Sequence, residues 1–182
     1  EGIILEDDCW PDITAFEFLQ VLLGRYRNHN KVQHINASNY QKGIKRGDSS
    51  YYYSAIPNIN GWATWRESWA QYDQLNNYFN IFKESRKIEA IFKERLAQKY
   101  WIEAFESSFS GNDTSWSTPY IFSFFFNDSL SVTPNNNLIS NIGYGRNSVH
   151  AKNSNDPSAN MPTVPMKFPL ESPLIINVDR IA

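Results

Sequence analysis

The stretch GIILEDDCWPD, residues 2–12, joins a short apolar run to three consecutive acids and a Trp-Pro-Asp sequence. Gly2 to Leu5 is a β-rich run without polar alternation, which is typical of a strand buried on both faces of a parallel α/β sheet. Side chains at the carboxyl end of such a strand project into the crevice where open α/β sheets bind ligands. The sequence therefore predicts that Glu6, Asp7 and Asp8 lie at a ligand-binding edge of a sheet.

The segments after the acids predict a βαβ unit. From Ile13 to Tyr26, apolar residues recur at spacings of three and four, and Asp12 stands where a helix N-cap is expected. Lys31 to Ile35 is typical of a second short strand, and a polar loop follows it over residues 36–50. The order strand, acidic turn, helix, strand is typical of α/β proteins.

The rest of the chain contains one long helical pattern and a polar end. The apolar spacing predicts a helix from Phe82 to Phe109, ended by Gly111 and Asn112. Residues 116–126 are apolar enough for a helix or a buried strand, and periodicity does not separate the two. Leu130 to Val132 resembles a strand, and Asn, Ser and Pro dominate from Ala151 to Pro173.

Length and composition limit the class of protein. A chain of 182 residues fits one domain with a real core, since burial on folding approaches roughly 70% at this size. A net charge of −2 and a pI near 5.9 provide no basic face, so we expect no nucleic acid as the main partner. The single cysteine, Cys9, excludes an internal disulfide and is compatible with a reducing compartment. No run reaches the roughly 18 apolar residues of a transmembrane segment, and no signal peptide is evident, which predicts a soluble protein.

The three acids allow two interpretations. Adjacent carboxylates repel one another, so they need a cation or hydrogen-bond donors to stay ionised together. A hard divalent ion such as Mg²⁺ or Mn²⁺, which shares its coordination with substrate phosphates, meets that need. The other interpretation is a solvated acidic turn before a helix that Asp12 caps, and residue types alone favour it.

Four ordered blocks resemble a known family. They are ILEDDCWPD at 4–12, GWATWR at 61–66, PNNNLISNIGYG at 134–145 with His150 after it, and KFPLESP at 167–173. The blocks are similar to those of bacterial nucleotide-diphospho-sugar transferases, also known as hemolysin-activation-like proteins. The resemblance implies the C-terminal part of a type-A glycosyltransferase, with a Rossmann-like mixed sheet flanked by helices. Residues 1–150 would form the metal- and acceptor-side portion, and residues 151–182 an extended tail packed on the same domain.

The resemblance also implies a metal site. Glu6 and Asp8 take the outer positions of an acid-x-acid pair that holds Mn²⁺ or Mg²⁺ on the diphosphate of a nucleotide-sugar, with Asp8 as the direct ligand. Asp7 would hold the motif or contact the ribose. His150 matches a histidine that reaches the same metal, since a neutral imidazole is an acceptable ligand beside carboxylates. The alternative for His150 is a hydrogen-bonded loop residue.

The GWATWR block implies contacts to the donor or acceptor. Gly61 would belong to the binding site, Trp62 and Trp65 would present flat apolar faces to a sugar ring, and Arg66 would contact phosphate or an acceptor hydroxyl through its planar fork. The alternative is that the tryptophans belong to the core at the start of a helix. We expect at least one of them, Trp62 foremost, to line the site.

The residue that would take the acceptor's proton departs from the family pattern. Relatives often carry an acid directly after the tryptophan equivalent to Trp116, where this chain has Ser117. Asp113 is the candidate substitute as catalytic base, although an N-cap for the next helix is the favoured interpretation of this residue.

These observations predict metal-dependent transfer of a sugar from a nucleotide-diphosphate donor to a glycan or lipid-linked acceptor, in the cytoplasm or peripheral to the inner membrane. Relatives carry further nucleotide-binding strands before the acids, so we expect the chain to be a fragment of a longer enzyme. The first alternative is a non-catalytic remnant that binds carbohydrate or a partner. The second is a metal-dependent phosphohydrolase, which would need more carboxylates at strand ends than the sequence offers.

Overall fold

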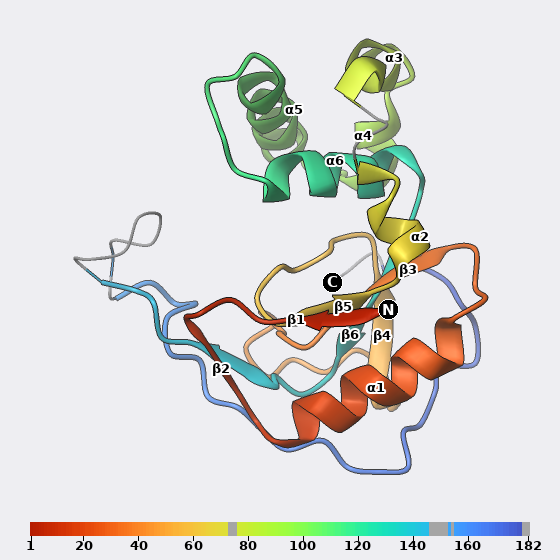
Figure 1. The fold of residues 1–182 in the computed structure, drawn as a ribbon, viewed down its shortest axis with the longest axis vertical. Helices are drawn as coiled ribbons and strands as arrows, with labels where there is room; N and C mark the ends of the chain where they lie inside the picture. The colour runs from red at the N-terminus through yellow and green to blue at the C-terminus, as the bar shows by residue number, and fades with distance from the viewer. Residues whose placement is uncertain (73–75, 146–152, 154, 180–182) are drawn as a thin grey trace. The chain divides into compact units, whose positions relative to one another are not determined.

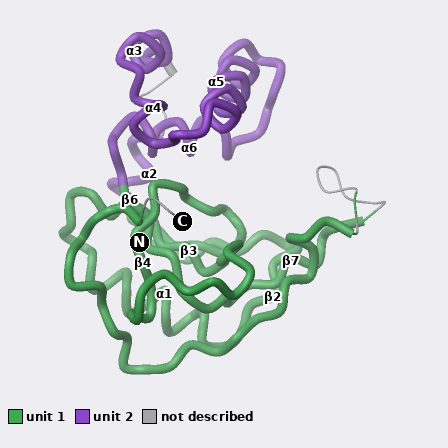
Figure 2. Tube along the Cα trace, turned by 180° about the vertical axis from the view of Figure 1, so that it is seen from behind, with its two compact units in different colours: residues 1–65, 130–182 green, residues 66–129 purple. Residues whose placement is uncertain are grey.

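The computed structural model describes residues 1–72, 76–145, 153 and 155–179, and it forms two compact units (Figures 1 and 2). Unit 1 comprises residues 1–65 and 130–182, and unit 2 comprises residues 66–129. Unit 2 is therefore one uninterrupted segment inserted between the two halves of unit 1.

Unit 1 contains a five-stranded mixed sheet in the order β1-β5-β3-β6-β4. The strands are β1 (Gly2–Ile4), β3 (Val32–Asn36), β4 (Tyr51–Ser54), β5 (Trp62–Thr64) and β6 (Leu130–Pro134). β3 and β6 are parallel, and the other neighbouring pairs are antiparallel. β1 and β3 thus run in the same direction with β5 between them. The protein is a mixed α/β protein, as predicted.

β1 is an edge strand, and the prediction of a strand buried on both faces between parallel neighbours is wrong. It pairs antiparallel with β5, with Ile3 opposite Ala63, and Ile3 remains 38% exposed. β5 begins at Trp62, where the sequence suggested the approach to a helix. Three apolar residues suit an edge strand as well as a central one, so the run itself could not fix the position of β1.

The helix predicted after Asp12 is confirmed as α1 (Thr14–Tyr26). Asp12 Oδ1 accepts a hydrogen bond from the Thr14 amide at 2.9 Å, which satisfies one of the free N–H groups at the helix start. The buried face of α1, which includes Phe18 and Leu22, packs in one apolar cluster with Ile35 and other residues of the sheet.

The C-terminal segment is part of unit 1. Met166 and Leu170 belong to its apolar cluster, and the Met166 amide donates to Thr14 Oγ1 at 2.9 Å. Val178 forms a parallel bridge with Tyr53, and the Asp179 amide donates to the Tyr53 carbonyl at 2.8 Å. The segment therefore supplies hydrogen-bond partners along β4, the strand at the opposite edge from β1.

Unit 2 is helical. Its elements are α2 (Arg66–Trp69), η2 (Asn76–Tyr78), α3 (Phe79–Glu84), α4 (Lys87–Ile91), α5 (Arg95–Phe109) and α6 (Ser117–Phe126). The single long helix predicted from Phe82 to Phe109 is wrong, because the chain turns at Arg86, with φ 54°, and is extended at Phe92. The interruptions let the aromatic side chains of α3, α5 and α6 and the isoleucines of α4 pack against one another in one cluster.

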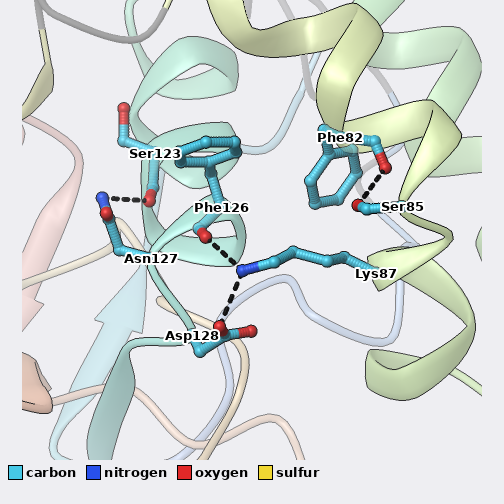
Figure 3. A network of polar contacts seen from close by, with 7 residues as sticks. All are labelled: Phe82, Ser85, Lys87, Ser123, Phe126, Asn127 and Asp128. Atoms are coloured by element: carbon cyan, nitrogen blue, oxygen red, sulfur yellow. Dashed lines mark hydrogen bonds and ion pairs between the residues drawn. The ribbon is translucent and has the colours of Figure 1, made fainter.

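Lys87 connects α4 to the C-terminal end of α6 by hydrogen bonds (Figure 3). Its Nζ donates to the Phe126 carbonyl and to Asp128 Oδ2, both at 2.7 Å. A cation at the last carbonyls of a helix also interacts favourably with the negative end of the helix dipole.

None of the helices in the part of the chain that the structure describes has the length and hydrophobicity that a bilayer crossing requires.

Candidate functional site

A two-stranded ribbon brings two of the sequence blocks together in unit 1. β2 (Cys9–Pro11) pairs antiparallel with β7 (Ile139–Asn141), with Cys9 opposite Asn141. The blocks at 4–12 and 134–145 therefore lie side by side, although about 130 residues separate them in the sequence.

The three acids occupy the turn that leads into β2. The Cys9 amide donates to the Glu6 carbonyl at 3.0 Å, which closes the turn. Asp7 is exposed at its tip, whereas Glu6 and Asp8 are half-buried. The structure thus separates the three carboxylates by exposure, with Asp8 directed toward the ribbon.

The protein holds Asp8 by its backbone and by its side chain. Its carbonyl accepts from the Ile142 amide at 2.9 Å, and its Oδ2 accepts from Asn141 Nδ2 at 3.0 Å. Gly143 lies so close that a Cβ placed there would stand 2.4 Å from Asp8 Oδ2. These contacts fix the position of the carboxylate that the resemblance identifies as the direct metal ligand.

Gly61 places the GWATWR block beside the same ribbon. Its φ of +67° and its approach to Ile139, whose Cγ1 would lie 2.6 Å from an added Cβ, both require glycine. The Ala37 amide donates to the Gly61 carbonyl at 2.9 Å, which anchors this position to the end of β3. Three of the four blocks therefore meet around the β2–β7 ribbon.

Two tyrosines near the acidic turn were missed by the sequence reasoning. Tyr40 OH accepts a hydrogen bond from Asn60 Nδ2. Burial raises the pKa of Tyr40, and burial followed by the charges of Asp156 and Asp8 raises the pKa of Tyr144. Both hydroxyls therefore stay protonated at neutral pH and can donate hydrogen bonds. Tyr144 stands inside the quoted NIGYG block, so its place in that block was the available signal.

The surroundings of Cys9 disfavour the ionised form of its thiol. Burial, together with the nearby carboxylates of Asp8 and Glu6, raises the pKa of its thiol to about 11. The thiol is therefore protonated at neutral pH, and the thiolate is the reactive form.

The two tryptophans of the GWATWR block have core positions. Trp62 is 1% exposed and stacks on the His34 ring at a centroid distance of 4.8 Å. Trp65 is also buried, and its Nε1 donates to the Leu23 carbonyl at 3.2 Å. A ring in this environment has no open face for a sugar, so the core interpretation applies to both residues instead of the expected lining of the site.

The remaining candidates belong to unit 2. Arg66 is exposed at the start of α2. Asp113 accepts from the Ser115 amide at 2.9 Å and from Thr118 Oγ1 at 3.1 Å, and the Ser117 hydroxyl contacts that of Ser115 at 2.8 Å. Asp113 therefore stabilises the turn at the start of α6, but the N-cap of that helix is Trp116, so the expected N-cap role of Asp113 is wrong.

The metal site was predicted to include His150, which lies outside the described residues. Within the described ranges, no three His, Cys, Asp or Glu side chains are grouped closely enough to hold a metal ion by themselves. Mg²⁺ sites, however, commonly use one or two carboxylates with substrate phosphates and water. The half-buried Asp8 carboxylate, with one oxygen held by Asn141, fits that smaller ligand set.

The fold and the site together define a mixed α/β protein with a polar cluster at an acidic turn. No family model, no curated protein and no solved structure matches the chain.

Proposed function

We propose that this chain is part of a glycosyltransferase that transfers a sugar from a nucleotide-diphosphate donor to a hydroxyl of a glycan or lipid-linked acceptor. The observation that supports the proposal is the meeting of three sequence blocks around the β2–β7 ribbon, against which Asp8 is held. They contribute the carboxylate itself, Asn141 with Gly143, and Gly61. A purely solvated acidic turn has no need for a buried amide and a glycine fitted to one of its carboxylates.

The candidate residues would bind the metal ion and donate hydrogen bonds to the substrate. Asp8 would bind Mn²⁺ or Mg²⁺. Glu6 and His150 would be the further ligands that the family resemblance implies. Such an ion, when bound, neutralises charge that develops on a departing diphosphate. The hydroxyls of Tyr40 and Tyr144, which remain protonated, would donate hydrogen bonds to a sugar, ribose or phosphate oxygen.

A non-catalytic binding remnant is the second candidate function. Two observations favour it over an active enzyme: Ser117 stands where relatives often carry an acid, and the carboxylate of Asp113 is engaged by Ser115 and Thr118. Such a remnant would keep the diphosphate-binding turn and lack a base for the acceptor.

Binding of Mn²⁺ tests the central claim. Free Mn²⁺ is measured by electron paramagnetic resonance during titration of the protein, alone and with UDP, GDP or ADP. We expect Asp8→Ala to weaken binding by more than tenfold, because it removes the direct ligand. Glu17→Ala is the matched control, since Glu17 is an exposed carboxylate on α1 of the same unit. Equal binding by the wild type and Asp8→Ala would contradict the proposal.

Turnover separates the two candidates. Release of nucleoside diphosphate is measured from a panel of nucleotide-sugars, with the chain and with its full reading frame. Turnover that Asp8→Ala abolishes supports the enzyme. Binding of Mn²⁺ that depends on Asp8, without turnover of any donor, supports the remnant.

A further inference from the structure

Asn141, the last residue of β7, connects Asp8 to the opposite strand of the ribbon. Its Nδ2 donates to Asp8 Oδ2 at 3.0 Å, and its Oδ1 accepts from the Gly143 amide at 2.9 Å. The residue is only 9% exposed. A buried amide with a partner at both ends has one favourable orientation, so it presents its N–H to Asp8 in a defined direction.

The surrounding backbone allows little adjustment. The Asn141 carbonyl accepts from the Asn160 amide at 3.0 Å, so the C-terminal segment fixes the strand end. Gly143 approaches the same oxygen, because a methyl group on its α-carbon would stand 2.4 Å from Oδ2 and 2.6 Å from the Asp8 Cβ. Oδ2 therefore lies against both an amide donor and a glycine.

The two oxygens of Asp8 have different surroundings. Oδ2 accepts the Asn141 hydrogen bond, whereas the contact of Oδ1 is a long one, 3.9 Å from the Cys9 sulfur. A carboxylate that gives one oxygen to a protein donor can give the other to a cation. Hydrogen-bond partners of this kind orient metal ligands.

We propose that Asn141 is a positioning residue that turns Oδ1 of Asp8 toward the divalent cation of a bound nucleoside diphosphate. This inference rests on the proposed function, and it adds a residue for which neither the sequence nor the family resemblance indicated a role. Gly143 is also needed at this position, because a larger residue would occupy the space that the oriented carboxylate fills.

The test is Mn²⁺ affinity in Asn141→Ala, measured by electron paramagnetic resonance with and without UDP, GDP or ADP. Loss of an outer partner of a metal ligand typically weakens metal binding by about 10- to 100-fold, and we expect a loss in that range. The spectrum of the bound Mn²⁺ should change as well, since the ligand geometry changes. Circular dichroism verifies that the variant is folded.

Asn137→Ala is the matched control. Asn137 also uses both ends of its amide, toward the Ile139 carbonyl and the Asn39 amide, in the segment just before β7. It is not a partner of Asp8, so we expect its loss to change Mn²⁺ affinity by less than about twofold. A loss as large as that of Asn141→Ala would show a general structural effect and overturn the positioning role.

Gly143→Ala provides a second route if Asn141→Ala does not fold. The added methyl group displaces the carboxylate while Asn141 stays in place, and we expect a similar loss of Mn²⁺ affinity. If Mn²⁺ binding depends on Asp8 but neither variant weakens it, the positioning role is wrong and the proposed function stands. If binding does not depend on Asp8 at all, the proposed function fails, and the inference fails with it.

Discussion

The two units differ in what fills their cores. Unit 2 has a core of phenylalanine rings, in which Phe82, Phe105, Phe122 and Phe125 are almost completely buried. The core of unit 1 has a similar apolar cluster but also buries many hydrogen-bonding side chains, among them His34, Asn36, Ser131 and Thr133. Packed rings tolerate several arrangements of similar energy, whereas a buried polar network stabilises only the arrangement that satisfies all its members.

Tyrosine hydroxyls show the same contrast. In unit 1, Tyr26 OH lies 2.7 Å from Tyr51 OH and 2.6 Å from Tyr53 OH, and Tyr51 donates to Ser172 Oγ at 2.9 Å. Phenylalanine rings of unit 2 meet edge to face, as Phe122 does with Phe82 and Phe105, but they carry no hydroxyl that could form such bonds. The unit with the candidate site is therefore the one whose geometry depends on directional bonds.

Phe122→Ala should have the largest effect. The side chain is completely buried, and its ring contacts Phe79, Phe82, Phe105 and Phe109. Its removal leaves a cavity, and we expect a loss of about 3–5 kcal/mol in the free energy of unfolding of unit 2. Chemical denaturation with hydrogen exchange of α5 and α6 measures it.

Leu96→Ala on α5 is the control for Phe122, because Leu96 is 84% exposed. We expect a change within about 0.5 kcal/mol. A cost at Phe122 no larger than the cost at Leu96 would mean that the ring cluster does not stabilise unit 2.

Asn36→Leu should destabilise unit 1 by about 3 kcal/mol. Asn36 Nδ2 donates to Thr133 Oγ1 at 2.6 Å, and its Oδ1 accepts from the Asn58 amide at 2.7 Å. Leucine has a similar volume but leaves these groups buried without partners, each at a cost of about 1–3 kcal/mol. Denaturant unfolding, followed by hydrogen exchange of β3 and β6, measures the change.

Asn136→Leu is the matched change at a more accessible position, where the amide donates to the Pro165 carbonyl at 3.0 Å. We expect less than about 1 kcal/mol, since water can replace this bond. If leucine were tolerated equally at both positions, the buried network would not determine the stability of unit 1.

The smallest effect concerns pH. Burial lowers the pKa of His34 from 6.5 to about 3 in the folded protein. Between these two values the unfolded chain binds a proton at His34 that the folded chain does not. The free energy of unfolding therefore keeps its full value above pH 6.5 and decreases as the pH falls toward 3. From pH 7.5 to pH 5 we expect a loss of about 2 kcal/mol, at about 1.4 kcal/mol per pH unit below 6.5.

The stability of His34→Phe, measured by denaturant unfolding at both pH values, isolates this contribution. Phenylalanine keeps a ring beside Trp62 but does not titrate. The difference between wild type and variant should therefore shrink as the pH falls. A difference that is independent of pH would show that His34 is protonated equally in the folded and unfolded chains.

The sequence predicted elements whose signals are local. The spacing of Leu19, Leu23 and Tyr26 predicted α1, which the structure confirms. Asp12, the expected N-cap, lies one residue before the observed N-cap, Ile13, and its side chain accepts from the Thr14 amide. The break at Arg86 could not be predicted, because the apolar pattern resumes after it with Ile88 and Ile91. The edge position of β1 depends on its pairing with β5, a three-residue strand that has no alternating pattern of its own.

The candidate site was predictable only in part. Asp8 follows from the acidic turn, and the importance of the 134–145 block follows from the family resemblance. The bond from Asn141 to Asp8 joins residues 133 positions apart, and no local pattern indicates it. Burial of Trp62 was also beyond prediction, because the same ring suits a core or a sugar site until its partner His34 is known.

The order of the strands along the chain has a consequence for synthesis on the ribosome. β4 ends at Ser54, but its partner β6 ends only at Pro134, after the whole of unit 2 has been made. At roughly 5–20 residues per second, this delay lasts about 4–16 s. During that time the three tyrosines of β4 have no strand beside them, whereas unit 2 needs only its own continuous segment. The nascent chain thus exposes a β-prone aromatic edge while its insert can already fold, and this interval is when binding by a chaperone would protect it most.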